Sequence, residues 1–164
     1  MNLHKEEHMV VEQSLTEALF RLMKKKPFSE ITITELISCA GVARSTYYRN
    51  YNSKEDIIRA FINQVVQEFR MEYPTESMKD RMSDAYFERV ANYVFRYHDN
   101  LSIIHKAGLS SLYLESLNDY FLEMADYDPS VGEEDKIYIY ALAGAQFNLI
   151  FNYLLPNMPD YDHP

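Results

Sequence analysis

Residues 44–50 bring together two cations and several hydrogen-bond donors within seven positions. The segment reads Arg-Ser-Thr-Tyr-Tyr-Arg-Asn and contains no acidic residue. Arginine, serine, threonine and asparagine side chains can donate to base edges in the major groove and to phosphate oxygens. On a short helix, such a set predicts a surface that reads nucleic acid.

Two short helices are predicted to position these side chains. The spacing of Thr32 and Glu35 matches a capping box, which predicts that a helix begins at Thr32 and continues to about Cys39. Gly41 stands where a helix end needs a residue with positive φ, and a second helix is expected over Arg44–Asn50. Two short helices joined by a glycine-containing turn form a helix-turn-helix pattern.

The rest of the chain is also predicted to be helical. Glycine and proline are scarce, and apolar residues recur at helical spacing. The sequence therefore predicts an all-α fold, with an N-terminal three-helix helix-turn-helix domain and a larger C-terminal helical ligand-binding and dimerisation domain. The other expected helices cover Val11–Leu22, Ser53–Tyr73, Met78–His98, Leu101–Met124 with a break near Gly108, and Glu133–Leu155.

Composition excludes several classes of protein. The chain has 164 residues, of which 47% are hydrophobic, and its single cysteine excludes a disulfide scaffold and a cysteine-based zinc site. No apolar run is long enough for a bilayer, and the polar N-terminus carries no secretion signal, so a cytoplasmic protein is expected.

The net charge of −9 alone argues against a nucleic-acid partner. That charge is unevenly distributed, however. Residues 1–60 hold nine Lys/Arg and eight Asp/Glu, so the acidity belongs to the remainder of the chain. The balance near the predicted helix-turn-helix is therefore compatible with DNA.

Three elements in fixed spacing make the chain similar to the TetR/AcrR family of transcriptional regulators. They are Ala40-Gly41-Val42, the run Thr46–Tyr51, and Ser53-Lys54-Glu55-Asp56-Ile57. The resemblance covers about Val11–Phe61. It implies a DNA-binding domain over residues 1–52 and an effector-binding and dimerisation domain over 53–164.

The resemblance also implies which residues contact double-stranded DNA. Ala43 departs from the family pattern, because a serine that caps the recognition helix is common at that position. Tyr47 and Tyr51 are expected to pack in the core. The expected DNA-binding residues are Thr32, Arg44, Ser45, Thr46, Tyr48, Arg49, Asn50 and Lys54.

The C-terminal half is rich in tyrosine and matches no sensor motif. Five tyrosines could line an aromatic effector pocket, although a plain aromatic core explains them equally well. These residues are Tyr86, Tyr93, Tyr97, Tyr113 and Tyr120.

The stretch Ile137–Leu155 is apolar on almost every side, which predicts burial against a second copy of the chain. Family members usually pair two C-terminal helices per subunit, so Leu109–Met124 must supply the second helix, or the interface is smaller. The expected interface residues are Tyr140, Ala141, Gly144, Ala145, Phe147 and Phe151.

Together these features predict a ligand-responsive repressor that binds a palindromic operator as a homodimer. Its effector cannot be named from the sequence, and no cofactor, metal site or membrane partner is expected. A protein-interaction module that keeps the fold without ligand-gated DNA binding is the alternative. No catalytic constellation is visible, so an enzyme is not predicted.

Overall fold

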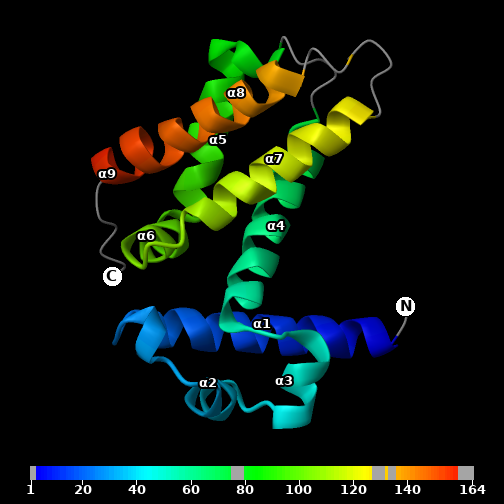
Figure 1. Ribbon diagram of the computed structural model, residues 1–164, viewed down its shortest axis with the longest axis vertical. Coiled ribbons are helices and arrows are strands. Elements are labelled where there is room, and N and C mark those ends of the chain that lie inside the picture. Colours follow the sequence, from blue (N-terminus) through cyan, green and yellow to red (C-terminus); the bar gives the residue numbers. More distant parts are fainter. Residues whose placement is uncertain (1–2, 75–79, 127–131, 133–135, 159–164) are drawn as a thin grey trace. The chain divides into compact units, whose positions relative to one another are not determined.

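The computed structural model describes residues 3–74, 80–126, 132 and 136–158, and every regular element within them is helical (Figure 1). This confirms the predicted all-α fold. The first elements are α1 (Leu3–Met23), the 3-10 turn η1 (Phe28–Glu30), α2 (Ile33–Ala40), α3 (Arg44–Asn50) and α4 (Lys54–Glu72). They are followed by η2 (Asp80–Met82), α5 (Asp84–Arg96), α6 (His98–Lys106), α7 (Ser111–Asp126), α8 (Lys136–Asn148), the π-helical segment η4 (Leu149–Leu154) and α9 (Leu155–Asn157).

The chain divides into two compact units, Met1–Phe61 and Ile62–Pro164, and α4 runs through the division. The first part of α4 therefore packs with the N-terminal helices. The predicted functional boundary at residue 52 stays a prediction. Two of the expected helices begin in segments, 75–79 and 133–135, that lie outside the described residues. No described helix is both long and apolar enough to cross a membrane.

Capping interactions confirm the predicted start and end of α2. The Thr32 side chain accepts a hydrogen bond from the backbone N–H of Glu35, and the Glu35 carboxylate accepts one from the backbone N–H of Thr32 at 2.9 Å. At the other end Gly41 has φ of +67°, and Val42 N–H donates to the Ile37 carbonyl. This is a Schellman motif, in which glycine takes a backbone conformation that side chains disfavour.

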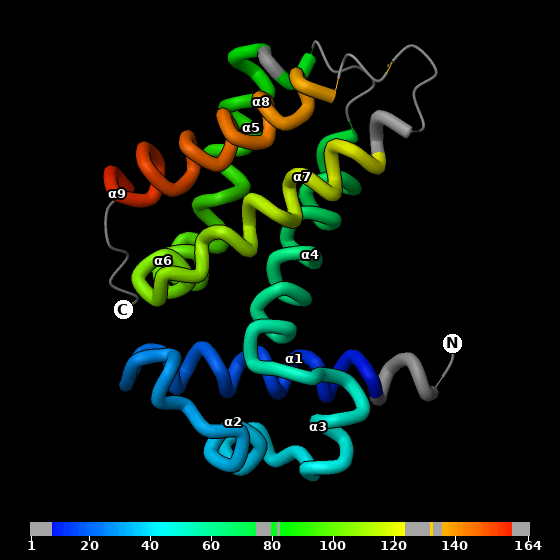
Figure 2. The backbone as a smooth tube through the Cα atoms, in the orientation of Figure 1, coloured from blue at the N-terminus to red at the C-terminus, as the bar shows by residue number. Residues whose placement is uncertain are grey.

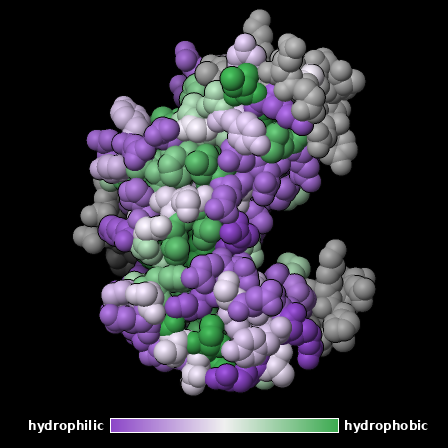
Figure 3. All heavy atoms as spheres, in the orientation of Figure 1, coloured by the Kyte–Doolittle hydropathy of each residue, from purple (hydrophilic) through white to green (hydrophobic). Residues whose placement is uncertain are grey.

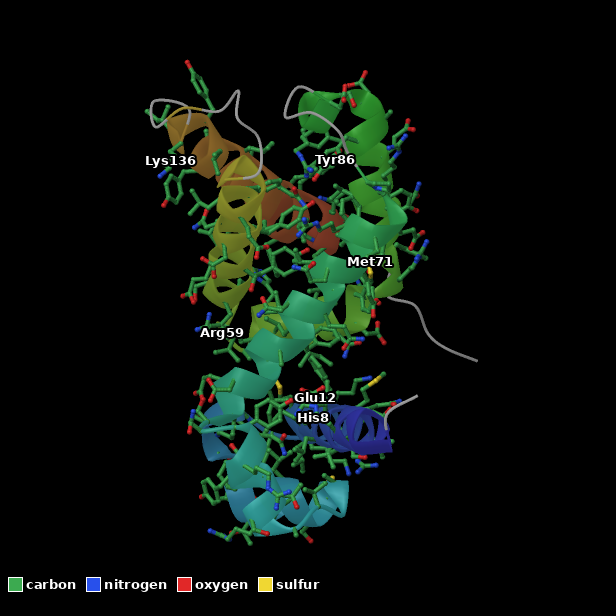
Figure 4. The ribbon with its side chains drawn as sticks, turned by 90° about the vertical axis from the view of Figure 1, so that its right-hand side faces the viewer. His8, Glu12, Arg59, Met71, Tyr86 and Lys136 are labelled. Carbon is green, nitrogen blue, oxygen red and sulfur yellow. The ribbon has the colours of Figure 1, made fainter. Side chains whose placement is uncertain are left out.

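The N-terminal unit packs around the middle of α1, which lies across α2 and α3 (Figure 2). Leu15, Leu19 and Leu36 are fully buried, and burial of apolar side chains such as these is the main force that holds the three helices together. The Arg21 guanidinium also ties α1 to α2, because its Nη2 donates to the Cys39 carbonyl at 2.8 Å. Toward the other end of α1, His8 and Glu12 lie one turn apart, and His8 Nδ1 is 3.4 Å from Glu12 Oε2 (Figure 4).

The C-terminal unit is built on a close pair, α7 and α8 (Figure 1). Phe121 of α7, Ile104 of α6 and Ile150 of η4 are completely buried in its core. The predicted break between α6 and α7 is present, since Gly108 has φ of +74° and Leu109 N–H donates to the Ile104 carbonyl. A second Schellman motif therefore ends α6 and lets the chain turn into α7.

A buried arginine organises the aromatic residues of this core. Arg81 is 1% exposed, and its Nη1 donates to the Tyr120 hydroxyl at 3.1 Å. The guanidinium carbon also lies 5.3–5.8 Å from the centres of the Tyr86, Tyr120 and Phe121 rings. The aromatic faces surround the guanidinium and stabilise its positive charge.

Candidate functional site

Helix α3 presents one polar face to solvent and one aromatic face to the core. Arg44, Ser45, Tyr48 and Arg49 are exposed, and their spacing places them on the same side of the helix. Tyr47 points the other way and is completely buried. The exposed face carries two positive charges and no acid, so its electrostatics favour a polyanion.

Tyr47 and Tyr51 pack in the core, as predicted. Tyr47 is 0% and Tyr51 is 6% exposed, and burial raises the pKa of each hydroxyl to about 12. The Tyr47 hydroxyl has no hydrogen-bond partner within the described part of the chain. Tyr48 is 52% exposed and stands edge-on to the Tyr47 ring, which supports its side chain from below.

Two of the expected DNA-binding residues, Thr32 and Asn50, use their side chains within their own helical segments. The Thr32 hydroxyl caps α2 and also donates to Glu35 at 2.8 Å. The Asn50 amide donates to the Thr46 carbonyl, one turn back in α3, at 2.7 Å. The predicted phosphate contacts of Thr32 and Asn50 therefore require a second hydrogen bond or a rearrangement of the side chain.

Among the expected DNA-binding residues, Lys54 differs most from its predicted role. The sequence predicts a phosphate contact, but its Nζ donates to the Phe28 carbonyl at 2.7 Å and to the Ile31 carbonyl at 2.6 Å. The same nitrogen lies 4.4 Å from the centre of the Phe28 ring. Lys54 thus fastens the start of α4 to the segment that leads into α2, a contact that no local pattern could reveal.

The start of α3 lacks a side-chain cap, as predicted from Ala43. This residue has the extended backbone of an N-cap, with φ of −67° and ψ of 145°, but makes no side-chain hydrogen bond. We expect Ala43→Ser to raise the unfolding free energy by about 1 kcal/mol, because serine can accept from the free backbone N–H groups of the first turn. Thermal melts would measure the gain, and an unchanged melting temperature would contradict it.

The capping box makes α2 sensitive to acid. Hydrogen bonds from the Lys26 ammonium, then from the Thr32 backbone and hydroxyl, lower the pKa of Glu35 from 4.5 to about 2. Since the folded-state pKa lies below the unfolded one, the stabilisation is complete above about pH 4.5 and is lost as the pH falls toward 2. We therefore expect the melting temperature of Glu35→Gln to fall less steeply over that range. Parallel curves for the variant and the original protein would refute this.

The predicted effector tyrosines mostly pack against one another, although Tyr120 also lines an open groove. Tyr93, Tyr113 and Tyr120 surround an internal space of about 10 Å³, which is room for one water molecule. Tyr86 is buried inside the C-terminal unit and donates to Gln146 at 3.1 Å (Figure 4). The geometry therefore matches the aromatic-core interpretation better than the pocket.

Tyr97 and Tyr93 belong to a separate cluster around Glu68. Burial opposes ionisation of the Glu68 carboxyl, but hydrogen bonds from Tyr97, Gln64 and Tyr93 outweigh it and lower the pKa. The carboxylate thereby accepts hydrogen bonds from Gln64 of α4, Tyr93 of α5 and Tyr97, the residue that caps the end of α5. These hydrogen bonds fasten α4 to the end of α5.

An open groove on the C-terminal unit offers more room. It lies between α4 and α7, has a volume of about 430 Å³, and is walled mainly by amide, hydroxyl and carboxylate side chains. Its principal lining residues are Asn63, Gln67, Ser116, Asp119, Tyr120 and Glu123. No sequence pattern signals this groove, because it depends on how two distant helices cross.

Most of the predicted interface residues lie on the surface of α8. Tyr140 is 51% exposed, Ala141 and Ala145 are exposed, and Gly144 is half-buried. Figure 3 shows apolar side chains at the surface of the C-terminal unit. Two further exposed residues of the predicted apolar stretch, Ile137 at 69% and Tyr138 at 68%, extend the same surface, although they are not among the six expected interface residues.

Phe151 does not share that surface. It is 1% exposed and packs edge-on against Tyr113 and beside Phe147, inside the core of its own chain. The π-helical segment η4 contains Phe151 and breaks the helical periodicity on which the prediction relied. We therefore exclude Phe151 from the candidate interface. Phe147 is half-buried and lies at the edge of that interface.

Comparisons with known proteins agree with this domain structure. Residues 15–61 match the model described as bacterial regulatory proteins, tetR family. No curated protein matched the chain. Among solved structures, the crystal structure of Lin0861 from Listeria innocua is similar, with a TM-score of 0.69 and 14% identity over 98% of this chain and 85% of that one. At that identity the likeness shows a shared fold. The helix-turn-helix geometry and the family match together show that residues 15–61 form a DNA-binding domain of the tetR type, and this domain supports a role as a transcriptional regulator.

Proposed function

We propose that this regulator is a repressor that binds a palindromic operator as a homodimer in the cytoplasm and responds to a small molecule. The observation that carries the proposal is the exposed, acid-free face of α3, with Arg44 at its first turn and Arg49 at its last. Such a face fits the major groove, where arginine recognises guanine and phosphate. Two copies related by a twofold axis read two half-sites of a palindrome.

Selection of DNA from a random pool by the purified protein tests this function. We expect enrichment of a palindrome whose half-sites are about one helical turn, ~34 Å, or somewhat more apart. Placing the enriched sequence between a promoter and a reporter gene then tests repression. Failure to enrich any sequence at low salt would contradict the proposal.

The homodimer rests on the surface formed by Ile137, Tyr140, Ala141, Gly144 and Ala145. Small side chains at its centre allow close approach of two helices, and a Cβ added at Gly144 would meet no atom within 4 Å. We expect Ala145→Glu to convert the dimer to a monomer and to weaken operator binding, because it places a charge in an apolar interface. Analytical ultracentrifugation would measure the mass.

Asn92→Glu on α5 is the matched control for that experiment, since it introduces the same charge at an exposed helical position. The control is expected to remain dimeric. A monomeric original protein, or a dimeric Ala145→Glu, would exclude this surface as the interface.

For the ligand response we propose the groove between α4 and α7, because the tyrosine core has room for about one water molecule. The acidic residues Asp119 and Glu123 favour a cationic ligand. Compounds that release the protein from its operator identify the effector. Asn63→Trp fills the groove and is expected to abolish that release while leaving DNA binding intact, and undiminished release would exclude the groove.

The alternative is a protein-interaction module. It is favoured by the small size of the space enclosed by Tyr93, Tyr113 and Tyr120. Under this alternative the chain selects no DNA sequence, although its fold is intact. DNA selection therefore separates the two functions without knowledge of the effector.

A further inference from the structure

Thr34 lies beside the predicted DNA-reading residues but is not among them. It is the second residue of α2 and is exposed. Its Oγ1 accepts a hydrogen bond of 2.7 Å from Nη2 of Arg44, the first residue of α3. The contact joins the exposed ends of two helices, across the turn that contains Gly41.

The position of Arg44 explains why this contact matters. An exposed arginine side chain has many rotamers, and the N-terminus of a helix repels a cation, so α3 alone does not hold the guanidinium in one place. The hydrogen bond to Thr34 restricts the side chain. It uses one of five N–H donors, and the other four remain for a base edge or a phosphate.

We propose that Thr34 is a positioning residue for base recognition, because it holds the Arg44 guanidinium in the orientation needed for a bidentate contact with a base. The inference rests on the proposed function, in which α3 enters the major groove. It assigns Thr34 an indirect effect on sequence preference that passes through Arg44. A direct contact between Thr34 and phosphate is the competing role, and it makes a different prediction, since phosphate contacts carry no sequence information.

Thr34→Val tests the proposal, because valine keeps the branched shape and removes the hydroxyl. Affinity is measured for the selected operator and for operators in which each base pair of the half-site is replaced. We expect discrimination at the base pair read by Arg44 to fall roughly fivefold, with little change at the others. Thr34→Ser keeps the hydroxyl and is expected to retain discrimination.

A double-mutant cycle with Arg44→Ala tests whether Thr34 acts through Arg44. In the Arg44→Ala background, Thr34→Val is expected to cause no further loss of discrimination, because the side chain that Thr34 positions is already absent. Thermal melts and circular dichroism of each variant check that the domain remains folded, and Thr34→Ala, which also removes the hydroxyl, replaces Thr34→Val if valine disturbs α2.

Three outcomes overturn the inference. Equal weakening of every operator by Thr34→Val would assign Thr34 to phosphate, and unchanged discrimination would show that Arg44 needs no support. Additive losses in the double mutant would show that Thr34 acts independently of Arg44. If the unmodified protein selects no sequence, the proposed function fails first and this inference falls with it.

Discussion

Replacing Lys54 with methionine is expected to lower the unfolding free energy of the N-terminal domain by about 2 kcal/mol. Methionine keeps the length of the side chain but cannot donate to the carbonyls of Phe28 and Ile31, which lose a charged partner at 2.7 and 2.6 Å. It also loses the attraction between the ammonium and the Phe28 ring. Urea denaturation measures the change.

Lys25→Met is the control for that variant, because Lys25 is exposed in the turn just after α1 and its replacement removes the same charge. We expect its stability to stay within about 0.5 kcal/mol of the original. Equal stability of Lys54→Met and the original protein would contradict the fastening role.

The salt dependence of DNA binding separates two roles for Lys54. A residue that neutralises a phosphate changes the slope of log affinity against log salt by about 0.9, whereas a fastening residue changes affinity without changing the slope. We expect Lys54→Met to leave the slope unchanged and Arg49→Ala to reduce its magnitude. A reduced slope for Lys54→Met would restore the phosphate contact that the sequence predicts.

Arg44→Ala is expected to weaken binding to the selected operator about tenfold or more and to relax the preference at one base pair. The loss cannot come from unfolding of α3, because alanine is the better helix former and a cation is unfavourable at the first turn. Gel shifts at fixed salt, on the operator and its single-base variants, measure both effects.

Arg49→Ala supplies the comparison, since Arg49 lies in the last turn of the same helix and is equally exposed. A phosphate contact predicts the same fractional loss on every sequence. If Arg44→Ala also weakened all sequences equally, the two arginines would share one role and base recognition would have to be assigned elsewhere on α3.

The features that sequence predicted well are those decided by neighbouring residues. The capping box of Thr32 and Glu35 needs only a spacing of three positions, and the positive φ of Gly41 follows from the end of a short helix. The inward direction of Tyr47 was expected from the family resemblance, and its side chain is completely buried. These local rules are enough to locate the reading helix.

The features that were missed depend on residues far apart in the chain. The partners of Lys54 lie 23 and 26 positions earlier, so its fastening role could not be predicted from its own segment. The space left between tyrosines depends on how α5, α7 and α8 pack, which composition does not determine. The wrong prediction for Phe151 has a local cause, because a π-helical turn rotates its side chain into the core. No sequence pattern signalled that turn.

The hydrogen bond between Tyr86 and Gln146 has a consequence for how the protein is made. It joins residues 60 positions apart, and the same core is closed by Ile150 and Phe151, so the C-terminal unit can complete its core only after α8 and η4 have left the ribosome. The N-terminal unit needs only residues up to Phe61 and can fold first. A nascent chain can therefore have a folded helix-turn-helix domain before its dimerisation surface exists. During this interval the aromatic side chains of the C-terminal unit are exposed to chaperones and proteases.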